Sequence, residues 1–210
     1  MERIFGYGED SLTYWALSTQ LTQILVNLHD DTPQEQCQVF YRPSFRRSGG
    51  PTSSQFGEFE AIIQSSRSTY LIESKWDHLN PAPNEVVLQP VQILRHSIFK
   101  WMHRKWAELQ PTSWPDFLNR AGTEFKLEFN GRTLANSGRL IARNCTELLV
   151  LLARGPAAMS NVLLYFASRG DAIPSSVVDS ELQPLTDPFQ LCILQFAALN
   201  DSGYFIMANS

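Results

Sequence analysis

Two short apolar segments on either side of four polar residues constrain this chain more than any other feature of its sequence. Residues 56–64 and 69–76 are rich in β-branched and aromatic side chains, and Ser65-Ser66-Arg67-Ser68 lies between them. This pattern predicts two antiparallel strands joined by a turn. With the turn centred between Ser66 and Arg67, each residue of one strand faces the residue equally distant from that centre in the other strand.

Four ionisable side chains interrupt these two strands. Alternation places Glu58 and Glu60 on one face of the first strand. It places Glu73 and Lys75 on one face of the second. In the predicted register Glu60 faces Glu73, and Glu58 faces the lysine. Directly opposed β-carbons lie about 4.5–5.5 Å apart, where two carboxylates repel each other unless a cation or a shared proton intervenes.

A divalent ion between Glu60 and Glu73, Mg²⁺ or Mn²⁺, removes this repulsion. Mg²⁺ binds carboxylate oxygens, and water and substrate phosphate commonly complete its octahedral shell. Lys75 would then lie beside the metal-bound water and stabilise the charge that develops on a phosphate. The alternative is an exposed hairpin face on which Glu58 pairs with Lys75 and the other two carboxylates point to water.

The rest of the chain shows helical and strand patterns in turn. A first helix begins at Asp10 or Ser11 and ends near residues 30–33. A long amphipathic helix covers about 87–109, and opposite its apolar stripe lie Gln92, His96, Lys100 and His103. Further elements are predicted as strands at 37–41, 125–129 and 161–167, a helix at 137–152, and a C-terminal hairpin between 191–198 and 204–207.

Composition is typical of a globular protein. Of 210 residues, 43% are apolar and 18% charged, enough for one well-filled domain without disulfides. The longest apolar stretches are far shorter than the roughly 18 to 20 residues that a membrane-spanning helix requires, so no membrane partner is expected. The N-terminal residues lack the pattern of a signal peptide, and the three cysteines lack disulfide or metal spacing. A cytoplasmic protein with reduced thiols is therefore expected.

The net charge of −4 does not direct the whole molecule to nucleic acid, so such binding would depend on local basic segments. Two segments qualify, and their basic residues are Arg42, Arg46, Arg47, Arg95, Lys100, Arg104 and Lys105. The first lies among glycine, proline and serine, and the second, between residues 86 and 107, contains no acidic residue. Both are candidate phosphate contacts, and solvated loop and helix faces are the alternative.

The long helix and the residues after it contain histidines that could bind a metal and tryptophans that could stack on bases. His96 and His103 share a helix face without a third ligand at metal spacing, so surface or phosphate-contact roles are favoured over a zinc site. Trp101, Trp106 and Trp114 have the spacing of a core more than that of a base-stacking surface.

One motif pair resembles a known family. Gly57-Glu-Phe-Glu-Ala-Ile62, followed by Glu73-Ser-Lys75, resembles the bipartite signature of the PD-(D/E)XK nuclease superfamily. The motif is similar in particular to that of small bacterial relatives of the Holliday-junction resolvases. The resemblance implies an α/β fold with a restriction-endonuclease-like core, in the order helix, three strands, helix and strand. It also implies metal-dependent hydrolysis of DNA phosphodiester bonds.

The resemblance assigns roles by position. Glu60 would be the first metal-binding acid, Glu73 the second and Lys75 the catalytic lysine. Glu9 would match an additional acid near the start of the first helix, although helix capping explains an acid there equally well. Gln92, with His96 four residues later, is similar to a Gln-x-x-x-Tyr element in which histidine replaces tyrosine. Glu60 stands where aspartate is usual, and its longer side chain puts the metal position and the activity in doubt.

The sequence thus predicts a single domain over 1–210, with a restriction-endonuclease-like core at about 9–167 and a C-terminal extension at about 168–210. The predicted function is Mg²⁺-dependent or Mn²⁺-dependent hydrolysis of DNA by Glu60, Glu73 and Lys75, with Glu9 and Gln92 as auxiliary residues. The expected DNA contacts are Arg42, Arg46, Arg47, Arg95, Lys100 and Arg104. The alternative is a catalytically degenerate member of the same fold that binds nucleic acid or a protein partner. The sequence leaves open whether the extension covers the site or forms a homodimer interface.

Overall fold

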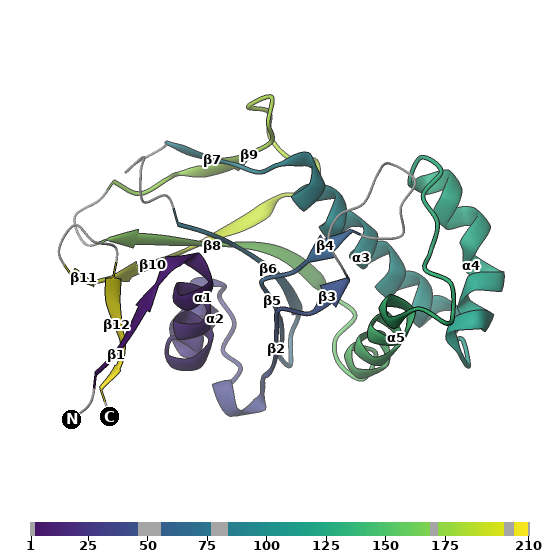
Figure 1. Cartoon of the computed structure of the whole chain (residues 1–210), viewed down its shortest axis with the longest axis horizontal. Coiled ribbons are helices and arrows are strands. Elements are labelled where there is room, and N and C mark those ends of the chain that lie inside the picture. The colour runs from purple at the N-terminus through teal and green to yellow at the C-terminus, as the bar shows by residue number, and fades with distance from the viewer. Residues whose placement is uncertain (1–2, 46–55, 77–83, 169–171, 200–203, 210) are drawn as a thin grey trace.

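The computed structural model describes residues 3–45, 56–76, 84–168, 172–199 and 204–209. Its centre is a mixed five-stranded sheet in the order β10-β8-β6-β5-β2 (Figure 1). The strands are β2 (Gln38–Tyr41), β5 (Ala61–Gln64), β6 (Thr69–Lys75), β8 (Met159–Ser168) and β10 (Phe189–Phe196). Strand β5 runs antiparallel to β2 and β6, whereas β6, β8 and β10 run parallel to one another. The chain therefore has an α/β fold.

The β5–β6 hairpin has the predicted register. Ala61 faces Ile72, and the pairing continues without a shift to Gln64 and Thr69 at the turn. The backbone N–H of Ser65 donates to the carbonyl of Ser68 at 2.9 Å and closes the turn. All residues of β5, and those of β6 up to Ser74, are buried because helices cover both faces of the sheet.

The strand predicted over residues 56–64 is interrupted. Its first part, β4 (Gly57–Glu58), leaves the large sheet and pairs with β3 (Ser44–Phe45). Glu58 therefore faces Ser44, and the prediction that it faces Lys75 is wrong. Gly57 has a φ of +100°, a backbone conformation that glycine adopts readily. The strand is interrupted two residues after it, between Glu58 and Ala61. Phe59 then turns inward and is completely buried in the core.

Helices pack on both faces of the sheet (Figure 1). Helices α1 (Gly8–Thr19) and α2 (Leu21–Asn27) cover one face, with the short 3₁₀ helix η1 (Gln34–Gln36) after them. The other face packs against α3 (Pro90–Leu109), together with α4 (Trp114–Glu128) and α5 (Leu140–Leu152). The predicted first helix is thus two helices, and the long helix begins three residues later than expected.

The strand predicted over residues 125–129 is wrong. Phe125 and Phe129 are both buried and lie one helical turn apart at the end of α4, with ring centroids 4.8 Å from each other. Apolar residues at i and i+4 suit a helix face as well as they suit alternation in a short strand, and packing against Trp101 selects the helix. The tryptophans favoured as core residues, Trp101, Trp106 and Trp114, are all buried.

The C-terminal residues add strands at several edges. Strand β10 extends the large sheet, and β9 (Ser176–Val178) pairs with β7 (Glu85–Val87). Strand β12 (Tyr204–Asn209) pairs with β11 (Ala198–Leu199) and with β1 (Arg3–Tyr7). The predicted C-terminal hairpin is correct only at Ala198, which pairs with Phe205, because most residues predicted for its first strand belong to β10 and pair in parallel with β8. Among the described residues, no helix is long and apolar enough to cross a membrane.

Candidate functional site

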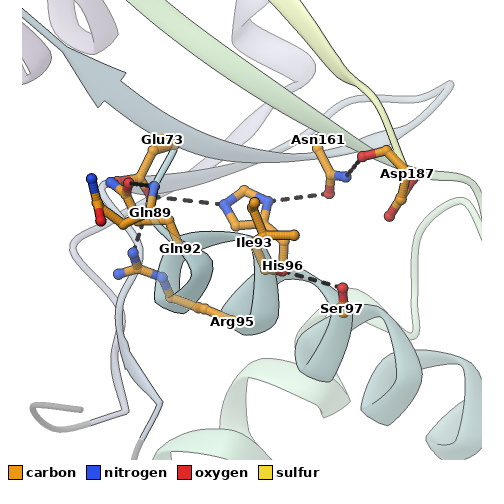
Figure 2. Close-up of polar contacts among 9 residues, drawn as sticks. All are labelled: Glu73, Gln89, Gln92, Ile93, Arg95, His96, Ser97, Asn161 and Asp187. Carbon is orange, nitrogen blue, oxygen red and sulfur yellow. Dashed lines mark hydrogen bonds and ion pairs between the residues drawn. The ribbon is translucent and has the colours of Figure 1, made fainter. Parts of the chain in front are cut away.

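Glu73 is a buried carboxylate near the end of β6, and its side chain is held by three residues of α3 (Figure 2). The residue is 3% exposed. Gln92 Nε2 donates to Oε1 of Glu73, and Arg95 Nη2 lies 3.2 Å from Oε2. His96 Nε2 lies 3.8 Å from the same oxygen. Residues at i, i+3 and i+4 share a helix face, so one face of α3 surrounds this carboxylate.

The first turn of α3 orients Gln92. The backbone N–H of Gln89 donates to Oε1 of Gln92 at 2.9 Å, and the Gln89 side chain accepts from the backbone N–H of Gln92 in return. This capping box leaves the Nε2 group of Gln92 directed at Glu73. The helix start and the carboxylate are therefore positioned by the same amide group.

His96 connects Glu73 to the neighbouring strand β8. Its Nδ1 lies 3.1 Å from Oδ1 of Asn161, whose Nδ2 donates to the carbonyl of Asp187 at 3.3 Å. Because that carbonyl can only accept, Asn161 presents its oxygen to His96, and Nδ1 carries the proton. Nε2 is then the atom that faces Glu73, and it has no hydrogen-bond partner in the described part of the chain.

Charges around Glu73 follow from this packing. Burial raises the pKa of Glu73, but His96 and Arg95 outweigh this effect and lower the pKa below its ordinary value. Burial lowers the pKa of His96, which is 1% exposed and lies between the rings of Phe59 and Phe189. Glu73 is therefore a carboxylate at neutral pH, with Arg95 as its nearest fixed positive charge.

Glu60 lies near enough to Glu73 for the charge of Glu73 to act on it, although the two residues are not partners in the strand ladder. It immediately precedes β5, one position beyond the last pair, Ala61 and Ile72. Burial and then the negative charge of Glu73 raise the pKa of Glu60 to about 7. Its Oε2 atom is buried and has no hydrogen-bond partner among the residues that the structure describes. An unpaired buried carboxylate oxygen beside a second carboxylate is suited to a cation.

Glu9 and Lys75 lie close to this pair. Oε2 of Glu9 accepts the backbone N–H of Trp76 at 2.8 Å, so the side chain is directed across to the end of β6 instead of capping its own helix. Burial raises the pKa of Glu9, and the charges of Lys75 and Glu73 act on it in opposite directions. The structure thus brings together Glu9, Glu60, Glu73 and Lys75, as well as Gln92.

Glu60 and Glu73 are the residues predicted to hold a divalent ion. In the side-chain positions described, no group of three or more His, Cys, Asp and Glu residues is placed to hold a metal. Mg²⁺ is, however, commonly bound by one or two carboxylates, with water and substrate phosphate as further ligands. Glu60 offers one unpaired oxygen for such a ligand set, whereas both oxygens of Glu73 already contact donors of α3.

The predicted phosphate contacts are dispersed. Arg42 forms ion pairs with Asp10 and Glu58, and Lys100 pairs with Asp187 at 2.8 Å. Arg95 is buried against Glu73, and its guanidinium lies 5.6 Å from the centre of the Phe59 ring. Arg104 is exposed on α3. Arg46 and Arg47 lie outside the described residues.

Sequence reasoning missed the roles of Arg95, His96 and Asn161. His96 and His103 were expected at the surface, but both are buried, so that expectation is wrong. The polar side of the first half of α3 faces inward because Glu73 and Asn161 offer it polar partners there. The available signal was a buried-strand pattern that contains Glu73, since a buried carboxylate requires donors from a neighbouring element.

Searches against protein-family models, curated proteins and solved structures find no match to this chain. Functional assignment therefore rests on the side chains described above.

Proposed function

We propose that this protein is a metal-dependent nuclease that hydrolyses DNA phosphodiester bonds. The observation that carries the proposal is the nearness of Glu60, directly before β5, to Glu73 of β6, whose charge raises the pKa of Glu60. Lys75 lies one alternation step further along β6. The elements α1, β2, β5, β6, α3 and β8 follow the order of the restriction-endonuclease-like core that the motif implies. Helices α4 and α5 are insertions between α3 and β8 in that scheme.

Each residue has a distinct task in this proposal. Glu60 and Glu73 would hold the ion, which supplies a polarised phosphoryl oxygen and an acidified water when bound. The Lys75 ammonium group stabilises the negative charge that develops on the phosphate. Gln92 and Arg95 hold the Glu73 carboxylate in one orientation, and the His96 ring lies beside it. These contacts preorganise the buried acid before substrate arrives.

Cleavage assays test the proposal directly. The wild-type protein with Mg²⁺ or Mn²⁺ is incubated with branched, single-stranded and duplex DNA, and products are resolved on denaturing gels. Cleavage should be lost in a Glu73→Ala/Lys75→Ala variant and kept in the matched control Glu128→Ala/Lys126→Ala, which changes exposed residues of α4. Wild-type protein that cleaves none of these substrates faster than the Glu73→Ala/Lys75→Ala variant would overturn the proposal.

A second candidate function is supported by the neighbours of Glu73. Both of its oxygens already contact donors of α3, and Arg95 offsets its charge in place of an ion. This favours a degenerate member of the fold that binds nucleic acid without cutting it. Such a protein should bind DNA with an affinity that falls steeply with salt and does not respond to Mg²⁺. Calorimetric titration with Mn²⁺ separates the two, because only the nuclease requires saturable binding that Glu60→Gln and Glu73→Gln remove.

A further inference from the structure

We propose that Tyr7, Tyr204 and Trp76 form a stacking platform for unpaired DNA bases beside the catalytic residues. This inference rests on the proposed function, and it names the substrate class of the same site. The three side chains are called the aromatic platform below. They come from three different strands or strand ends, so only the tertiary structure brings them together.

Two rings of the platform are exposed, and the third, Trp76, is half-buried. Tyr7 ends β1 and Tyr204 begins β12, and the two residues are register partners. Their ring centroids are 5.1 Å apart, and the Trp76 ring meets Tyr7 edge-on at 6.0 Å. Tyr7 is nevertheless 55% exposed and Tyr204 48% exposed. Aromatic rings that remain about half exposed to water are available to a ligand with flat apolar faces.

The platform adjoins the catalytic residues through the chain itself. Tyr7 is separated from Glu9 only by Gly8, and Trp76 directly follows Lys75. The backbone N–H of Trp76 donates to Oε2 of Glu9 at 2.8 Å, so the end of β6 is hydrogen-bonded to the first turn of α1. The platform therefore adjoins Glu9 at the end of β6, with its Trp76 ring packed on the face of the sheet that α1 covers, whereas Glu73 faces α3.

The platform contacts buried aromatic rings of the core. Trp76 meets Phe196 edge-on at 6.0 Å, and Phe196 contacts Phe205, which in turn contacts Trp15 of α1. Phe196 and Phe205 are almost completely buried. The exposed rings are thus anchored to the core and are held in place before a ligand binds, which lowers the entropy cost of stacking.

A second exposed ring pair involves a residue of α1. Tyr14 and Tyr41 are 52% and 41% exposed, with centroids 5.7 Å apart. The Tyr41 hydroxyl donates to the carbonyl of Asp10 at 3.2 Å, and Arg42 pairs with the Asp10 carboxylate. Glu9 therefore contacts a residue of the platform, and Asp10 contacts Tyr41 of the second pair and the Arg42 guanidinium.

The chemistry of these surfaces favours unpaired DNA over duplex. Every base has a flat face that stacks on aromatic rings without regard to sequence. In a duplex those faces are covered by neighbouring base pairs, whereas single strands and the unpaired parts of branched DNA leave them accessible. A tyrosine-rich surface next to a phosphate-handling site matches a ligand that alternates flat bases with phosphates.

Binding measurements test the platform. Fluorescence anisotropy with Ca²⁺ compares a labelled single-stranded oligonucleotide with its duplex, using the wild type, Tyr204→Leu, Tyr7→Leu and the Phe variants of both. Each Leu substitution should weaken single-strand binding about 5- to 100-fold and leave duplex binding almost unchanged. The Phe variants keep the ring and should bind like the wild type.

Crosslinking gives a readout that does not depend on folding of a variant. A 5-iodouracil-substituted single strand bound to the wild-type protein and irradiated should crosslink to peptides that contain Tyr7, Tyr204 or Trp76. Crosslinks confined to other peptides would overturn the platform. So would a change in sedimentation of the Leu variants without a change in DNA affinity, because the surface would then serve self-association.

The outcomes separate the platform from the nuclease proposal. Single-strand binding that requires the rings, in a protein that never cleaves, supports the platform and rejects the nuclease. Cleavage of single strands and duplex at equal rates, unaffected by the Leu substitutions, supports the nuclease and rejects the platform.

Discussion

Nε2 of His96 lies 3.8 Å from Oε2 of Glu73, while Nδ1 of the same ring lies 3.1 Å from Oδ1 of Asn161. The imidazole thus links a carboxylate of β6 to an amide of the parallel neighbour β8. All three side chains are buried, and Nδ1 of His96 and Oδ1 of Asn161 satisfy each other.

This network should behave as a unit. His96→Phe retains a flat ring between Phe59 and Phe189 but removes both nitrogens, and Asn161→Ala removes the partner amide. Each substitution should lower the free energy of unfolding by about 1–3 kcal/mol. In a double-mutant cycle measured by urea unfolding, the coupling should be at least about 0.5 kcal/mol. Additive effects would show that the ring and the amide act independently.

Gly57 should not tolerate a side chain. Its φ of +100° is unfavourable for other residues, and an added Cβ would lie 3.2 Å from Nη1 of Arg95. Gly57→Ala should lower the free energy of unfolding by about 1–3 kcal/mol. Gly122→Ala is the matched control, because a Cβ in that helix meets nothing within 4 Å and should be neutral or stabilising by up to about 1 kcal/mol. Equal urea midpoints for the two variants would contradict this account.

Glu60 should make stability depend on pH. Because its pKa is raised from 4.5 to about 7 by burial and by Glu73, the folded protein binds more protons than the unfolded chain between these values. Stability should therefore fall as pH rises through this window. Glu60→Gln should remove this loss of stability with rising pH. Above pH 7 its free energy of unfolding should exceed that of the wild type by up to about 3 kcal/mol, with little difference at pH 4.5. Thermal unfolding from pH 4.5 to 8 measures this. Parallel curves for Glu60→Gln and the exposed control Glu147→Gln would reject it.

Asp30 should stabilise the β5–β6 turn in the opposite pH direction. Burial raises its pKa, but hydrogen bonds from Ser65, Thr32 and Tyr70 outweigh burial and lower the pKa to about 2. The stabilisation is present above the ordinary value of 3.8 and is lost as pH falls toward 2.

The variant Asp30→Asn should cost about 2 kcal/mol at pH 7 and much less at pH 2. Chemical denaturation at both pH values checks this prediction. The exposed residue Asp31 supplies the control Asp31→Asn, which removes only its ion pair with Arg67 and should change stability by less than about 1 kcal/mol. A loss at Asp30 that is equally large at both pH values would indicate lost packing instead of lost charge.

The sequence by itself determined the β5–β6 hairpin and its register, because turn residues and side-chain alternation act over a few neighbouring positions. The nearness of Glu60 to Glu73 also followed from that register, although the ladder ends one pair before them. The long helix α3 was also predictable, since its apolar spacing is a local property.

Only the tertiary structure decided which side of α3 faces inward, where Glu58 pairs and which strand receives β10. Each depends on a partner distant in the sequence: Glu73 and Asn161 for α3, Ser44 for Glu58, and β8 for β10. Periodicity predicts which side chains share one face of an element, but not which residues of other elements contact that face. The polar side of α3 is therefore predicted to face solvent from sequence alone, although the buried Glu73 carboxylate on β6 gives it a partner inside the fold.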